Sequence, residues 1–139
     1  MVSSRPDGVA ALSLVEVLGG AGTIVIGAYF LNAVNAIAAS VGLGLANVPD
    51  FLTFFAVEAA LGGVAVVTGL ALWTRKEWGW TLAVYGGVAV LVFGVGMGAY
   101  FMATYGDFTE TEAMFLPMVV SLGAVAYLDR PFPKSFFGK

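Results

Sequence analysis

Four long apolar blocks, each nearly free of charge, constrain this sequence more than any other feature. They occupy about residues 9–39, 51–73, 78–105 and 110–128. A membrane-spanning α-helix needs about 20 predominantly apolar residues, and lipid forces such segments to satisfy their backbone groups internally. The sequence therefore predicts an all-α membrane protein. We expect a single transmembrane domain over residues 1–139, with four transmembrane helices in an up-down-up-down bundle.

The composition excludes several classes of function. The chain is 60% hydrophobic and only 11% charged, whereas a soluble domain is about 25% charged. It contains no Cys and no His, which removes the usual nucleophile, general base and transition-metal ligands. A net charge of −3 argues against the basic surface that nucleic-acid binding requires. We therefore expect no enzymatic activity, no metal, no cofactor and no nucleic-acid partner.

The basic residues indicate the orientation. Lys and Arg near the ends of membrane spans are retained on the cytoplasmic side. With four spans, the two termini and the loop between spans two and three share one side, and all six basic residues fall there: Arg5, Arg75, Lys76, Arg130, Lys134 and Lys139. In the other two loops every charged residue is acidic, namely Asp50, Asp107, Glu110 and Glu112. We predict a multi-pass protein of the plasma membrane with both termini in the cytoplasm.

The turn between spans two and three combines basic and aromatic residues. Arg75 and Lys76 are flanked by Trp73, Trp78 and Trp80. Trp is enriched at membrane interfaces, and basic residues there attract anionic lipid headgroups. This cluster is interpreted either as a headgroup-binding site or as a simple interfacial anchor for the turn.

Local signals mark two helix starts and the end of the chain. Asp50 is expected to be the N-cap of span two. Thr109 and Glu112 have the spacing of a capping box, which predicts a helix start near residue 110. Pro117 lies inside the fourth block, where we expect a bend. Residues 129–139 are polar and basic and are predicted to form a cytoplasmic tail.

Glycine spacing predicts how the helices pack. Lipid is as apolar as Leu, so membrane helices associate through small residues that let their backbones approach. Three pairs of glycines are each seven residues apart, which places a small residue on one face every two turns, and one further pair makes a GxxxG motif. The predicted packing positions are Gly20, Gly27, Gly62, Gly69, Gly87, Gly94 and Gly98.

Two carboxylates within the spans are candidates for function, because leaving a charge in hydrocarbon is costly. Glu58 lies seven residues into span two, and Asn32 and Asn35 of span one are predicted at its depth. A Glu–Asn cluster is either a structural hydrogen bond with a protonated carboxyl or a proton-coupled cation site. Glu16 lies near the opposite end of span one, so the two glutamates are not predicted to form a pair.

The surroundings of Glu16 suggest a second interpretation. The segment Val-Glu-Val-Leu-Gly at residues 15–19 resembles the Ala-Glu-Val-Ile-Gly segment of small multidrug resistance transporters. Those are also four-helix proteins, and that segment carries their substrate- and proton-binding glutamate. The match covers five residues, and the later motifs of that family have no counterpart here. The resemblance implies a substrate- and proton-binding role for Glu16.

Three further segments, taken together, resemble a widespread group of small four-helix membrane proteins of archaea and bacteria. The first is Arg-Pro-Asp-Gly-Val at residues 5–9. The second runs from Gly-Leu-Ala-Leu-Trp at 69–73 to Trp-Gly-Trp-Thr at 78–81. The third is Tyr-Leu-Asp-Arg-Pro at 127–131, followed by Phe-Phe-Gly at 136–138. This resemblance implies the four-helix topology and brings no activity with it.

Two functions follow as hypotheses. The first is an accessory or scaffold protein that associates with itself or with a larger complex in the bilayer, and the charge-free third span offers Gly94, Gly96 and Gly98 as a contact face. The second is a small proton- or cation-coupled transporter using Glu58, Glu16 or both. A water-accessible cavity that reaches either glutamate would favour transport, whereas a filled bundle with Glu58 bonded to an asparagine would favour the scaffold.

Overall fold

All regular structure in the described part of the chain is α-helical. The computed structural model describes residues 7–42, 49–106 and 115–138. The helices are α1 (Asp7–Ser40), α2 (Pro49–Trp73), α3 (Glu77–Tyr105), α4 (Phe115–Leu128) and α5 (Pro131–Phe136). The predicted all-α class is confirmed. Three helices (α1, α2 and α3) are long and apolar enough to cross a membrane, and α4 is a shorter apolar helix.

The first three helices correspond closely to the predicted spans, each extending a residue or two beyond its expected bounds at one end or both. For the fourth, the described helix α4 comprises Phe115–Leu128, and residues 110–114 of the expected span lie outside the described residues. The capping box formed by Thr109 and Glu112 lies outside the described residues. The bend expected at Pro117 falls within one turn of that boundary and stays a prediction, as do four complete crossings.

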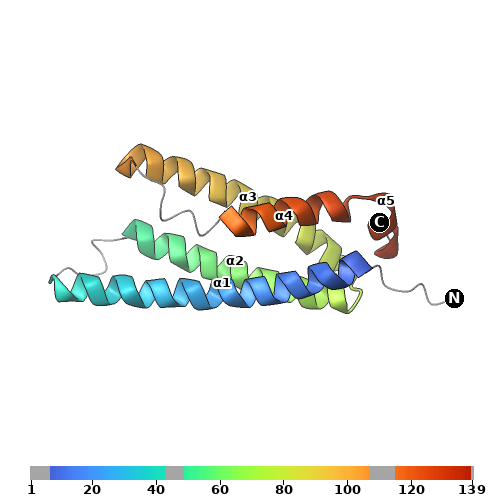
Figure 1. The fold of residues 1–139 in the computed structure, drawn as a ribbon, viewed down its shortest axis with the longest axis horizontal. Coiled ribbons are helices and arrows are strands. Elements are labelled where there is room, and N and C mark those ends of the chain that lie inside the picture. The colour runs from blue at the N-terminus through green and yellow to red at the C-terminus, as the bar shows by residue number, and fades with distance from the viewer. Residues whose placement is uncertain (1–6, 43–48, 107–114, 139) are drawn as a thin grey trace.

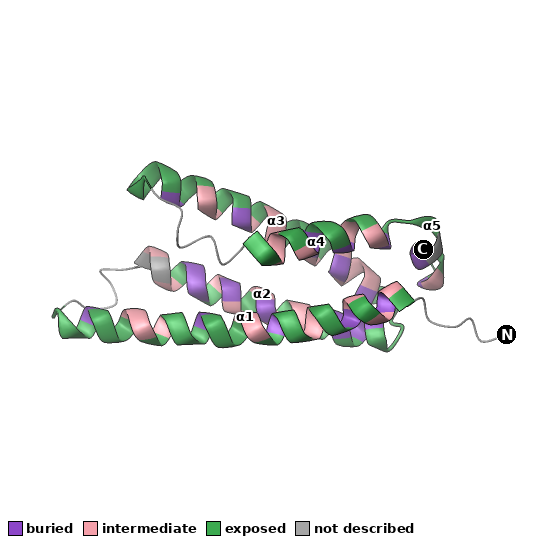
Figure 2. Ribbon diagram, in the orientation of Figure 1, coloured by how far each residue is buried: buried purple, intermediate pink, exposed green. Residues whose placement is uncertain are grey.

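The helices form a chain of neighbouring pairs. α1 packs along α2, α2 along α3, and α3 along α4. The start of α1, the end of α4, α5 and the α2–α3 turn lie at one end of the molecule, which we call the termini end, while the end of α1 and the start of α2 lie at the opposite or far end (Figure 1). Large apolar side chains such as Val25 and Val92 are exposed. Exposed residues cover much of α1 and α3, as the green parts of the ribbon show (Figure 2). This is the exterior that a lipid-facing helix requires.

Glycine determines the approach of α1 and α2. A Cβ added to Gly20 would stand 2.5 Å from the carbonyl oxygen of Gly62, and one added to Gly62 would stand 2.7 Å from that of Gly20. Closer to the termini end, a Cβ on Gly69 would stand 2.6 Å from the oxygen of Ser13. The two backbones are therefore in direct contact, because no side chain separates them.

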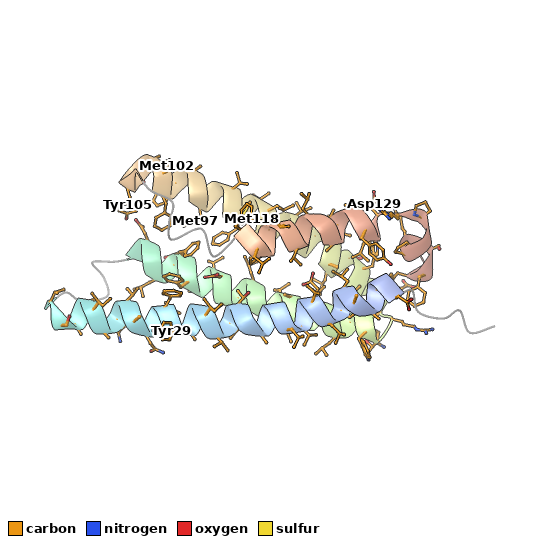
Figure 3. All side chains as sticks on the ribbon, in the orientation of Figure 1. Tyr29, Met97, Met102, Tyr105, Met118 and Asp129 are labelled. Atoms are coloured by element: carbon orange, nitrogen blue, oxygen red, sulfur yellow. The ribbon has the colours of Figure 1, made fainter. Side chains whose placement is uncertain are left out.

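Two apolar clusters occupy the two ends of the bundle. The termini-end cluster joins one buried residue from each of the four long segments to the residue after α5: Val9, Leu72, Ala83, Leu128 and Phe137. The far-end cluster is aromatic, with Phe54, Phe55 and Phe101 at its centre. Met97 and Met118, labelled in Figure 3, pack against it from α3 and α4.

The end of the chain is more ordered than a polar tail. Pro131–Phe136 forms α5, and Phe137 directly after it is only 2% exposed within the termini-end cluster. Arg75 lies over the Phe136 ring at 5.1 Å from its centroid, which ties α5 to the α2–α3 turn. The prediction of a simple cytoplasmic tail at 129–139 missed this helix, because two prolines and several charges obscured the apolar anchor.

Candidate functional site: a cavity lined by two glutamates

A cavity of about 530 Å³ lies among α1, α2, α3 and α4. Its size falls in the range of small-molecule pockets, which run from about 300 to 1,000 Å³. The lining is predominantly apolar, with small residues where α1 meets α2. Its polar side chains are Glu16, Thr23, Glu58, Thr68 and Ser121.

Helical periodicity explains how two glutamates reach one cavity. Residues seven apart return to nearly the same face of a helix. Glu16 and Thr23 are related in this way on α1, and Glu58 and Ala65 are related in this way on α2; all four line the cavity. Each glutamate therefore lies on a stripe that faces inward along about two turns.

Glu58 is the most constrained polar residue of the site. Its side chain is 2% exposed, and its Oε2 atom is buried without a hydrogen-bond partner in the described part of the structure. An unpaired buried carboxyl group costs free energy, and far more when it is ionised. The group therefore needs either a proton or a positively charged neighbour to be accommodated.

The asparagines predicted as partners of Glu58 lie elsewhere. Asn32 and Asn35 are both exposed on α1, and within the described ranges neither satisfies the buried Oε2 of Glu58. The α1 face that contacts α2 carries Gly27, where a Cβ would stand 3.2 Å from the Phe55 oxygen. At about 100° per residue, Asn32 points roughly 140° away from Gly27. The register of α1 and α2, with Gly20 facing Gly62 and Gly27 facing Phe55, also places Asn32 about 12 Å from the level of Glu58, so neither the predicted depth nor the predicted direction was correct.

The two glutamates lie at different levels of the cavity. Ser13 faces Gly69 and Gly20 faces Gly62, so seven steps along α1 match seven steps back along α2. On this register Glu58 comes level with Ile24, eight residues beyond Glu16. At 1.5 Å per residue, the two levels are separated by about 12 Å along the bundle. The glutamates are therefore not a contacting pair, but they share one cavity.

The apolar clusters border the cavity toward both ends of the bundle. Ala83 belongs both to the cavity lining and to the termini-end cluster. Leu61 and Val90 line the cavity and pack against the far-end cluster. The cavity is only partly enclosed, and α1 and α4, which both line it, form no interface comparable to those of the neighbouring helices within the described ranges.

The aromatic and basic cluster at the termini end divides into two sets. Trp80 is turned inward: its Nε1 donates a hydrogen bond of 3.0 Å to the Leu128 carbonyl oxygen. The ammonium of Lys134 lies 5.6 Å from the centroid of the Trp80 ring and forms a 3.1 Å ion pair with Asp129. Trp80 therefore ties α3 to α4 and α5. The exposed members of the predicted anchor are Trp73, Arg75, Lys76 and Trp78.

One polar cluster at the far end was not anticipated from the sequence. Tyr100 and Tyr105 both donate hydrogen bonds of 2.8 Å to Oδ2 of Asp50. These contacts join the first turn of α2 to the last turns of α3, and Tyr105 is labelled in Figure 3. The prediction of Asp50 as the N-cap was wrong, because α2 begins at Pro49 and Asp50 lies within its first turn. The five-residue spacing of the tyrosines gave no signal, because a helix does not place such residues on one face.

Thr68 and Ser121 were also missed as lining residues. A single hydroxyl within an apolar helix is ordinarily satisfied by its own backbone, so neither position stood out in the sequence. Among the described residues, no group of three or more acidic side chains is placed to hold a metal ion. No protein-family model, curated protein or solved structure matches this chain. Function is therefore argued from the cavity itself.

Proposed function

We propose that this chain crosses the plasma membrane four times with both termini in the cytoplasm. Three long apolar helices and the apolar α4 support the crossings. The described basic residues support the orientation, because Arg75, Lys76, Arg130 and Lys134 all belong to the α2–α3 turn or to the segment around α5, at the termini end. Positive charge of this kind is retained on the cytoplasmic side.

Single cysteines test this topology on a background that contains none. Ser40→Cys places a thiol at the far end and Ser135→Cys places one at the termini end, both at exposed positions. In intact cells, a membrane-impermeant maleimide should label Ser40→Cys alone. Labelling of Ser135→Cys before the membrane is permeabilised would contradict the orientation.

We further propose that the protein is a small proton-coupled transporter of cations. The observation that carries this proposal is the unpaired, buried carboxyl oxygen of Glu58 on a cavity that Glu16 also lines. No basic side chain is among the described residues that line this cavity. A cation that enters would therefore find negative charge without competition from a neighbouring Lys or Arg.

The coupling follows from charge. A bound cation and a carboxyl proton both neutralise the same glutamate, so the binding of one weakens the binding of the other. Protonation on one side of the membrane then releases the cation, and loss of the proton on the other side restores the site. The clusters at the two ends would separate the cavity from the two aqueous phases in turn.

Reconstituted protein tests the transport proposal. Liposomes with a pH gradient should accumulate tetrapropylammonium against its own gradient when they contain the parent protein. Glu58→Gln removes the charge with little change in shape and should abolish this flux. Glu77→Gln is the matched control, because Glu77 is an exposed carboxylate outside the cavity lining. Equal flux by parent protein and Glu58→Gln would contradict the proposal.

The scaffold hypothesis retains support from the outer surface. Gly96 and Gly123 are exposed, and a Cβ added at either would meet no described atom within 4 Å. Small residues on an outer face allow a second membrane helix to approach closely. The predicted α3 contact face is used in part within the chain, since a Cβ on Gly94 would collide with Met118. Loss of self-association on Gly96→Leu, with no flux in the parent protein, would favour the scaffold.

A further inference from the structure

We infer that the ligand of the cavity is an elongated organic dication whose two positive groups are joined by an apolar chain. This inference rests on the proposed function, since it specifies the class of cation that the site accepts. Its basis is the placement of Glu16 and Glu58 on one cavity, at levels about 12 Å apart by the helical rise.

The donor set argues against a bare hard cation. Calcium takes six to eight oxygen ligands and magnesium requires an octahedral set, all converging on one point. Beyond the two carboxylates, the described lining offers only the hydroxyls of Thr23, Thr68 and Ser121. The hydroxyl of Thr23 already donates to the Gly19 carbonyl. These oxygens are distributed over both levels and do not converge.

The space between the carboxylates is suited to hydrocarbon. On the register of α1 and α2, the lining between the two levels includes Leu61 and Ala65 together with small residues of α1. An alkyl chain gains from burial against such a surface, whereas a chain of polar groups would lose its hydrogen bonds to water. An organic ammonium also sheds its hydration more readily than a compact ion, because its charge is shielded by its own carbon atoms.

Two charges fit better than one. A ligand with a single charge at Glu58 would leave Glu16 to be neutralised separately, and the reverse holds for a ligand at Glu16. A charge left in a membrane cavity is costly, so the second carboxylate has to be met by a second positive group or by a proton. A dication of matching length satisfies both levels at once.

The bis-quaternary methonium series provides the probe. Its members carry two trimethylammonium groups on alkyl chains of increasing length, and octamethonium brings the nitrogens to about the spacing of the two levels. Binding to the full chain in nanodiscs of zwitterionic lipid would be measured by calorimetry, with empty nanodiscs subtracted. The single-headed alkyltrimethylammonium of equal chain length is the matched control ligand.

The expected result is an affinity maximum near octamethonium, with hexamethonium and dodecamethonium weaker. Octamethonium should bind about tenfold more tightly than its single-headed counterpart, the ratio that corresponds to about 1.4 kcal/mol. Glu16→Gln should remove both the maximum and the advantage of the second charge, while binding of the single-headed ligand remains. Glu58→Asp should keep binding but shift the maximum, which covers the case in which Glu58→Gln fails to fold.

An affinity that rises steadily with chain length, identically in the parent protein and in Glu16→Gln, would overturn the inference. Such a result would still leave the proposed function intact if Glu58→Gln lowered the affinity for the single-headed ligand. The proposed function would instead be overturned if Glu58→Gln kept its native helicity and bound every cation as tightly as the parent protein. Glu77→Gln should leave all of these affinities unchanged.

Discussion

Adding one methyl group at Gly20 should weaken the α1–α2 interface. The new Cβ of Gly20→Ala would stand 2.5 Å from the Gly62 carbonyl oxygen and 2.9 Å from the Cβ of Ala65. Ordinary contact begins at 3.4 Å, so the shortfall at the carbonyl is 0.9 Å. The oxygen belongs to the helix backbone and cannot swing aside, and the two helices must therefore separate.

The magnitude follows from two opposing effects. Overpacking of a close interface costs about 1–3 kcal/mol. Replacing Gly by Ala within a helix stabilises it by up to about 1 kcal/mol. Gly19→Ala provides the control, because it shares the second effect and has no described atom within 4 Å of its new Cβ. The free energy of unfolding of Gly20→Ala should therefore fall below that of Gly19→Ala by about 1–3 kcal/mol.

Reversible unfolding in mixed micelles with increasing SDS would measure this difference. Far-UV circular dichroism follows helicity, and the intrinsic fluorescence of the three tryptophans reports on the termini end. Gly27→Ala should fall between the two variants, because its Cβ would stand 3.2 Å from the nearest backbone oxygen. Equal stability of Gly20→Ala and Gly19→Ala would refute the direct backbone contact between α1 and α2.

Three further predictions concern the cavity and the termini end. Glu58→Leu should raise the free energy of unfolding by about 1–3 kcal/mol, the cost of a buried polar group without a partner, and should abolish cation binding. A less stable variant in the same SDS titration would show that the carboxyl group has a hydrogen-bond partner in the native protein. Phe137→Ala should open the termini end, so a Thr68→Cys thiol in the cavity should react faster with a water-soluble maleimide than it does beside the native Phe137. Trp80→Phe removes the hydrogen bond to Leu128 and should lower the free energy of unfolding by about 0.5–1.5 kcal/mol. Unchanged stability would indicate that water replaces the bond.

The elements of the fold followed from local sequence. Block length and the scarcity of charge were sufficient to predict α1, α2 and α3, because a segment that must satisfy its backbone within lipid has little choice but a helix. The concentration of Lys and Arg in the termini and the α2–α3 turn depends only on chain order, so it could be read without any tertiary structure. Glu58 and Glu16 were singled out for the same reason, as rare charges in apolar helices.

The arrangement of these residues was decided by tertiary packing. Helices that are apolar around their whole circumference carry no hydrophobic periodicity that shows which face points inward, and small residues mark only the closest contacts. The sequence could therefore not give the direction in which Asn32 and Asn35 point, and they lie on the exposed side. Glycine spacing indicated the contact between α1 and α2, but the cavity forms only where all four helices meet, and their packing places both glutamates in its lining. Burial of Phe137 likewise depends on four helices meeting at one end, which no local pattern encodes.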